Sequence, residues 1–139
     1  MKIETIQNET YTISCSGEEL RAIKAGLGET SEAWSEEYAQ KTGFEKKTFR
    51  EVIYYINPIY KSCKNCCTLT LSDEQMRICL EGLRRLLEIW DWEYPVRTGF
   101  DKEEIRHVYT DLGNIYKFSK HWNRDRTDSQ VQQDNAKCP

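Results

Sequence analysis

The feature that most constrains the fold of this chain is an internal repeat. Residues 11–61 align with residues 67–117 at a constant offset of 56 without a gap, and 19 of the 51 aligned positions are identical. Unrelated sequences of this composition would share roughly three positions by chance. The best stretch pairs KTGFEKKTFREV, residues 41–52, with RTGFDKEEIRHV, residues 97–108. We therefore expect one supersecondary unit, duplicated and used twice.

Each copy opens with an extended run, at residues 11–15 and 67–71. The alternation of apolar and polar residues, together with the β-branched side chains, predicts strands there. A first helix follows, and its start in each copy carries a capping box. The capping pairs are Ser16 with Glu19 and Ser72 with Gln75. Gly26 and Gly28 predict a shorter or frayed first helix in copy one, and Gly82 predicts a close backbone contact in copy two.

An aromatic connector and a Thr-Gly-Phe turn lead to a second helix in each copy. We expect these helices at residues 45–57 and 101–113, ended by Pro58 and Gly113. The unit is then β-α-α. Two such units can pair their strands and pack four helices on one face of the sheet.

The predicted fold class is therefore α+β, a tandem duplicated β-α-α unit that forms one small sheet packed against helices. We expect a single pseudo-symmetric domain over residues 1–122, with a short edge strand at residues 2–7. Residues 123–139 are polar and predict a disordered tail.

Charge and hydropathy exclude several classes of function. Lys and Arg total 20 against 23 Asp and Glu, a formal charge of -3, which argues against a strongly basic nucleic-acid coat. No run of 18 apolar residues is present, so we expect no membrane span. The first twelve residues lack the apolar stretch of a signal peptide, which favours a cytoplasmic location.

Catalytic and metal-binding patterns are sparse. There is no Gly-rich phosphate loop, HExxH or GxSxG, so we expect no enzyme activity and no cofactor. Cys63, Cys66 and Cys67 form a single CxxC with one neighbour, and four zinc ligands cannot be assembled from the sequence. A zinc-stabilised module stays an alternative, but we predict no metal site. Cys79 falls on an apolar helix position and is expected to fill core space.

Residues 37–56 resemble the helix-turn-helix signature of DNA-binding regulators. Gly43 lies at the turn, and the second helix would present its cations to a major groove. The candidate DNA-binding residues are Lys46, Lys47, Thr48 and Arg50. The corresponding helix of copy two carries a net charge of -2 over residues 101–113, which phosphates would repel. A transcriptional regulator is therefore the alternative function, with nucleic acid the less favoured partner.

Residues 68–112 resemble small bacterial and phage proteins of the immunity-protein type. The matching features are a strand, a Ser-capped helix start at Ser72, a Glu-Tyr connector and the turn Arg97-Thr98-Gly99-Phe100. The resemblance implies a non-catalytic immunity or inhibitor protein, or a phage anti-defence protein. Its partner would be a toxin or a nucleic-acid-handling enzyme.

An acidic aromatic segment in copy two is the candidate partner-binding site. Trp92 has no aromatic counterpart in copy one, where Glu36 stands, so we expect it to be a surface anchor. Acidic residues around an aromatic anchor favour a basic protein surface. The predicted partner-binding residues are Trp92, Asp91, Glu88, Glu93 and Tyr94. A homodimer that forms through exposed strand edges also stays an alternative.

Overall fold

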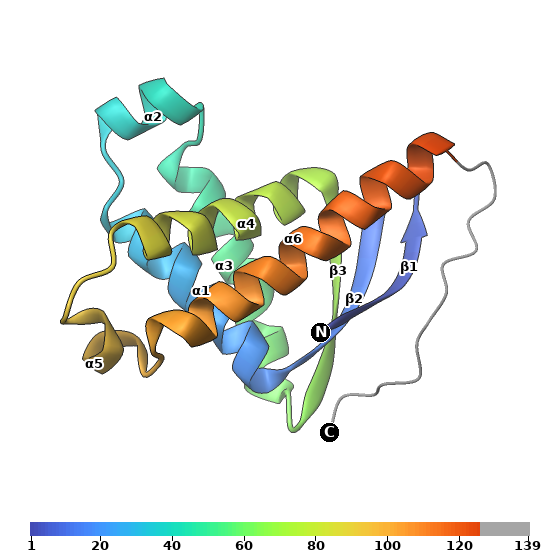
Figure 1. Cartoon of the computed structure of the whole chain (residues 1–139), viewed down its shortest axis with the longest axis horizontal. Helices are drawn as coiled ribbons and strands as arrows, with labels where there is room; N and C mark the ends of the chain where they lie inside the picture. Colours follow the sequence, from blue (N-terminus) through green and yellow to red (C-terminus); the bar gives the residue numbers. More distant parts are fainter. Residues whose placement is uncertain (126–139) are drawn as a thin grey trace.

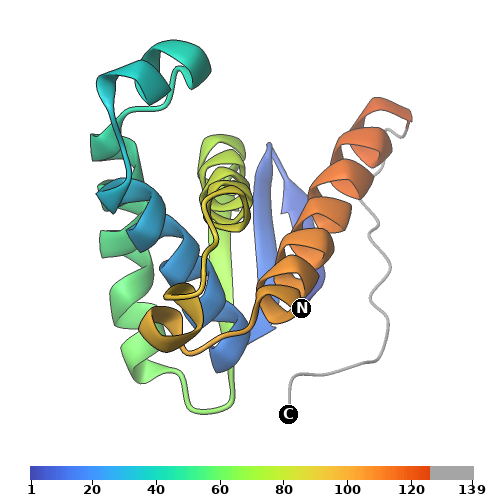
Figure 2. The same ribbon diagram turned by 60° about the vertical axis from the view of Figure 1, so that its left-hand side comes forward.

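The fold is α+β, as predicted. The computed structural model describes residues 1–125, with side chains described through residue 117, so the predicted tail at 126–139 lies outside the described residues. The elements are β1 (Lys2–Gln7), β2 (Thr10–Ser16), α1 (Gly17–Glu32), α2 (Glu36–Thr42), α3 (Lys46–Ser62), β3 (Cys66–Ser72), α4 (Asp73–Glu88), α5 (Tyr94–Thr98) and α6 (Lys102–Asp125). The strands form an antiparallel sheet in the order β1-β2-β3, and the long helices lie over one face of it (Figures 1 and 2). No helix in the described part of the chain is long and apolar enough to span a membrane.

Alternation along the strands explains why one face of the sheet is covered. Successive side chains of a strand point to opposite faces. The inward positions are buried and apolar in both central strands: Tyr11, Ile13 and Cys15 in β2, and Leu69 and Leu71 in β3. The outward positions of β2 and β3 are mostly serine and threonine, which are half-buried or exposed. The helices therefore pack on the apolar face alone.

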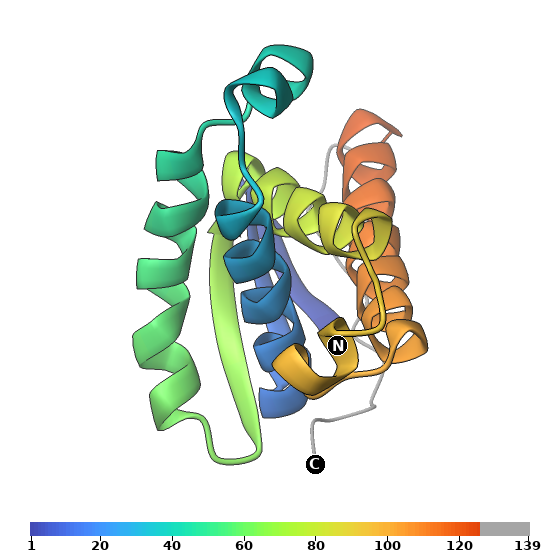
Figure 3. The ribbon, with the colours of Figure 1, turned by 90° about the vertical axis from the view of Figure 1, so that its left-hand side faces the viewer.

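Two contacts between the halves join equivalent positions of the sequence repeat. Ile13 of β2 pairs with Leu69 of β3 in the sheet, and these residues are 56 positions apart. In the helix layer, Gly26 of α1 lies against Gly82 of α4, again 56 positions apart. Helices α3 and α6 flank the crossed α1 and α4 (Figure 3). A duplicated unit would give this arrangement, but the duplication itself stays a prediction.

Both predicted capping boxes are confirmed. Ser16 Oγ accepts from the backbone N–H of Glu19, and the Glu19 carboxylate accepts from the N–H of Ser16. Ser72 and Gln75 make the same pair of hydrogen bonds at the start of α4. Strands β2 and β3 therefore pass directly into α1 and α4, because the serine that ends each strand also accepts from a free N–H group in the first turn of the helix.

The helices are longer than the sequence predicted. Helix α1 is not shortened by its glycines and has 16 residues, the same length as α4. Gly26 is buried where the two helices cross, so packing offsets its poor helix propensity. The predicted connectors contain the short helices α2 and α5, so the unit is β-α-α-α instead of β-α-α.

The predicted ends of the second helices at Pro58 and Gly113 are also wrong. Pro58 lies inside α3, which continues to Ser62, because Ile59 and Tyr60 pack against the core beyond it. Helix α6 passes through Gly113 to Asp125, because Ile115 and Tyr116 continue its apolar face. Residues 123–125 are therefore helical and do not belong to the predicted tail.

A tyrosine from α3 covers part of the free edge of β3. The Tyr55 hydroxyl donates to the carbonyl of Thr70 at 2.7 Å and accepts from its backbone N–H at 3.1 Å. One side chain thus satisfies both outward backbone groups of a residue on the edge strand. This contact makes edge-to-edge pairing through β3 less favourable.

The crossing of α1 and α4 generates the first prediction. A Cβ at position 26 would lie 2.9 Å from the backbone carbon of Gly82, so we expect Gly26→Ala to lower the free energy of unfolding by about 1–3 kcal/mol. Gly28→Ala is the matched control in the same helix, because a Cβ there meets nothing within 4 Å. Urea unfolding of both variants checks this. Equal stability of the two would contradict the close crossing.

Candidate functional site

Trp92 projects from the turn between α4 and α5. Its side chain is 82% exposed, and Val96 in α5 is 86% exposed. Asp91 and Glu93 stand on either side of Trp92 and are exposed as well. The Asp91 carboxylate accepts from the backbone N–H of Glu93 at 2.8 Å, which fixes the turn that carries the indole. We call Asp91, Trp92, Glu93 and Val96 the Trp92 patch.

Two of the predicted partner-binding residues lie elsewhere. Tyr94 is only 8% exposed and stacks on Trp90 with ring centroids 5.5 Å apart, so its ring belongs to the core and not to a contact surface. The Glu88 carboxylate accepts hydrogen bonds from Arg84 and Arg85 and faces α2. Its charge is compensated locally, so it adds little to an acidic rim around Trp92.

The predicted helix-turn-helix segment consists of α2, a turn and α3. Gly43 ends α2 with a φ of 80°, a left-handed conformation that glycine adopts without strain. Of the four candidate DNA-binding residues, Lys47 and Arg50 are exposed, whereas Lys46 and Thr48 are half-buried. The segment therefore presents two of its predicted contacts fully to solvent.

A partly buried network joins α2 to α4 through a tyrosine–carboxylate hydrogen bond, and the sequence reasoning missed it. Arg84 donates to both carboxylate oxygens of Glu81, at 2.8 and 2.9 Å. The Tyr38 hydroxyl also donates to Glu81. Glu81 is 9% exposed, so its charge is balanced within the protein. The available signal was an acidic residue inside an apolar helix stripe with an arginine three positions later.

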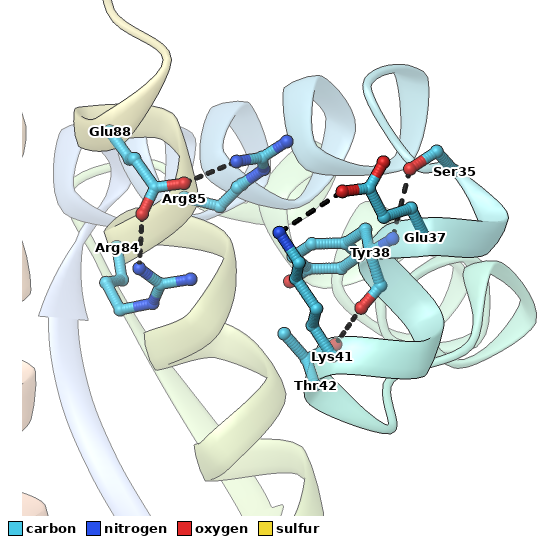
Figure 4. A pocket seen from close by; sticks show the side chains of 8 residues that line it. All are labelled: Ser35, Glu37, Tyr38, Lys41, Thr42, Arg84, Arg85 and Glu88. Carbon is cyan, nitrogen blue, oxygen red and sulfur yellow. Dashed lines mark hydrogen bonds and ion pairs between the residues drawn. The ribbon is translucent and has the colours of Figure 1, made fainter.

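A cavity of about 410 Å³ lies beside this network, between α2 and α4. Figure 4 shows Lys41 and Glu37 facing it from α2, and Arg84, Arg85 and Glu88 facing it from α4. The ion pairs at its surface remain within single helices. Lys41 pairs with Glu37 at 3.2 Å, and both arginines pair with Glu88.

The electrostatics of the cavity follow from these contacts. Burial and the hydrogen bond to Glu81 raise the pKa of Tyr38 above its ordinary value, so the phenol stays neutral. Hydrogen bonds from Arg84 and Arg85 lower the pKa of Glu88. The hydrogen bond to Glu81 raises the pKa of the Arg84 guanidinium. At neutral pH the Tyr38 phenol is therefore neutral, whereas Arg84 and Glu88 are charged.

The cysteines do not form a metal centre among the described residues, where no group of three potential ligands is found. Cys15 and Cys67 face each other across β2 and β3 with their sulfurs 3.8 Å apart. Burial raises the pKa of the Cys67 thiol to about 11 and that of Cys79 to about 12, which disfavours the reactive thiolates. Cys79 is buried in the core, as predicted.

Comparisons with known proteins identify no relative of this chain. No protein-family model, no curated protein and no solved structure matches it.

The network between α2 and α4 generates the second prediction. We expect Tyr38→Phe to lower the free energy of unfolding by about 1.5–3 kcal/mol near neutral pH, because a hydrogen bond to a buried carboxylate is lost. The wild-type bond needs the neutral phenol, whose unfolded pKa is 10.0 and whose folded pKa is higher. The advantage over Tyr38→Phe is therefore complete below pH 10 and declines above it.

Urea unfolding of the two proteins, at neutral pH and on the alkaline side of the tyrosine titration, measures this difference. Comparing the pair at each pH cancels the titration of the other tyrosines, lysines and cysteines. A difference that stays constant through the alkaline range would contradict the assigned hydrogen bond.

Proposed function

We propose that this protein is a non-catalytic binding protein of immunity or inhibitor type, which docks through the Trp92 patch onto a basic surface of another protein. The observation that carries the proposal is the exposure of Trp92, 82%, on a turn held by its own hydrogen bonds. Tryptophan is enriched among the residues that dominate binding energy at protein interfaces. A large indole exposed on a fixed turn needs no ordering of the chain before it binds.

The charge around the indole supports a basic partner. Residues 88–96 contain three acidic residues and no basic one, and Glu88 is the only one of the three with cationic partners among the described ion pairs. Asp91 and Glu93 therefore face solvent beside the anchor. Complementary charge of this kind raises the association rate and selects against acidic surfaces.

The mechanism that fits this arrangement is occlusion. A basic site that handles nucleic acid carries cations spaced to meet phosphates. Asp91 and Glu93 would pair with such cations while Trp92 and Val96 bury their apolar surface, so the site could not accept its own polyanion. This mechanism needs no catalytic group on the present chain.

The patch generates the third prediction. We expect the double variant Trp92→Ala, Asp91→Lys to lose a stoichiometric protein partner that wild-type protein captures from its native lysate after nuclease treatment. Tyr54→Ala is the matched control, because Tyr54 is a 71% exposed aromatic residue on α3, outside the patch. Retention of the same partner by the double variant would refute the proposed surface.

Binding of DNA through α3 is the second candidate function, favoured by the exposure of Lys47 and Arg50 beside the glycine turn. Tyr54, which follows Arg50 by one helical turn, adds an exposed aromatic ring to the same helix. Cations with an interleaved aromatic residue suit a phosphate backbone and unstacked bases.

This candidate generates the fourth prediction. If α3 binds DNA, the triple variant Lys46→Glu, Lys47→Glu, Arg50→Glu abolishes binding of duplex DNA measured by fluorescence anisotropy at low salt. Under the protein-binding proposal, wild-type protein shows no saturable DNA binding in the same titration. Its capture of the partner then survives the triple substitution.

A further inference from the structure

The cavity between α2 and α4 has a counterpart at the equivalent place of the repeat, where α5 lies over α1. At that counterpart, Arg97 of α5 makes an ion pair with Glu29 of α1 at 2.5 Å. This pair links the short helix directly to the long one. The corresponding positions in the cavity, 56 residues away, are Lys41 and Arg85.

Lys41 keeps the positive charge of Arg97, but Arg85 replaces the negative charge of Glu29. At these two positions the cavity therefore has two cations where the counterpart has a cation and an anion. Arg84 and the carboxylates of Glu37 and Glu88 line the cavity as well. Among the described residues, no ion pair crosses from α2 to α4; each cation pairs with an acid of its own helix. Figure 4 shows the charged ends of both side chains directed into the space between the helices.

We propose that this cavity binds a small molecule through an oxyanion, a phosphate or carboxylate group, that bridges Lys41 and Arg85. The ligand oxygens would give Lys41 the anionic partner across the gap that Glu29 gives Arg97 at the counterpart. A guanidinium offers two parallel N–H donors to such a group, and the lysine ammonium adds a third. The volume of about 410 Å³ leaves room for more than the anion itself.

The partners that now hold the two cations are weak competitors. Lys41 and Glu37 are both more than 70% exposed and four residues apart on α2, and such solvent-exposed pairs contribute little to stability. Glu88 is half exposed and shares its carboxylate between two arginines. An incoming oxyanion can therefore displace Glu37 from Lys41 and share Arg85 with Glu88.

The floor of the cavity is fixed before any ligand arrives. Tyr38 is buried and hydrogen-bonded to Glu81, and Arg84 holds both oxygens of that carboxylate. Arg85 lies over the Tyr38 ring at 5.0 Å, which limits the directions its guanidinium can take. Since these contacts set the spacing of α2 and α4, the Arg85 guanidinium needs little reorganisation to meet an anion.

Titration with inorganic phosphate at constant ionic strength, balanced by sodium chloride and followed by heteronuclear NMR, tests the proposal. We expect saturable binding to the wild-type protein with shift changes centred on α2 and the end of α4. Arg85→Gln and Lys41→Gln each weaken that binding about tenfold or more, because each removes charge-assisted hydrogen bonding to the anion. Glu37→Gln strengthens it, because a competing carboxylate is removed.

Lys61→Gln on α3 is the control for general loss of positive charge, and Trp92→Ala is the control for the partner surface. Both leave phosphate binding unchanged, so the proposal stands or fails independently of the Trp92 patch. Far-UV circular dichroism verifies that each variant is folded. Absence of saturable binding to the wild-type protein, or equal binding by wild type, Arg85→Gln and Lys41→Gln, overturns the proposal.

Discussion

The close approach of two helix backbones at Gly26 and Gly82 is the constraint on which the rest of the helix layer depends. A methyl group at either position would meet backbone atoms of the other helix at about 3 Å. With the two backbones in contact, α1 and α4 form a central pair, and α3 and α6 can each pack against one of them. The sheet register repeats the same relation, since Ile13 pairs with Leu69. In the helix layer and in the sheet alike, the two halves of the chain therefore meet at equivalent positions of the repeat.

Local chemistry made the strands and helix starts predictable. Strand alternation and the capping serines act over a few residues, so the sequence alone places them correctly. Helix ends were not predictable in the same way. Pro58 and Gly113 are poor helix residues, but apolar residues beyond each of them pack on the core, and this tertiary gain decides where the helix ends.

In the candidate site, too, local features were predictable and features that depend on tertiary contacts were not. The exposure of Trp92 followed from a comparison within the sequence, because position 36 of the other copy is a glutamate. The burial of Tyr94 did not, since it depends on stacking with Trp90. The role of Glu81 could not be predicted, because its hydrogen-bond partner Tyr38 lies 43 residues away in the sequence. Long-range polar contacts of this kind leave little trace in local sequence.

The equivalent turns at the ends of α2 and α5 share the contacts that hold their backbone, and they differ in other residues. In both copies a threonine hydroxyl donates to the carbonyl of the preceding tyrosine, at 2.8 Å from Thr42 and 2.7 Å from Thr98. Both turns end on a glycine with positive φ. These shared contacts form the backbone frame of both turns.

This frame does not constrain the residues that differ between the two halves of the repeat. An exposed glutamate at position 36 serves the same turn that carries Trp92 in the other copy, so packing does not account for the indole. Likewise a glutamate at position 29 makes an ion pair across one interhelical gap, whereas Arg85 at the equivalent position makes none across the other within the described part of the chain. An exposed tryptophan carries a cost in solvation that the fold does not recover. Binding to another molecule, as proposed for the Trp92 patch and for the cavity, would bury the indole and give Lys41 and Arg85 a shared counter-ion.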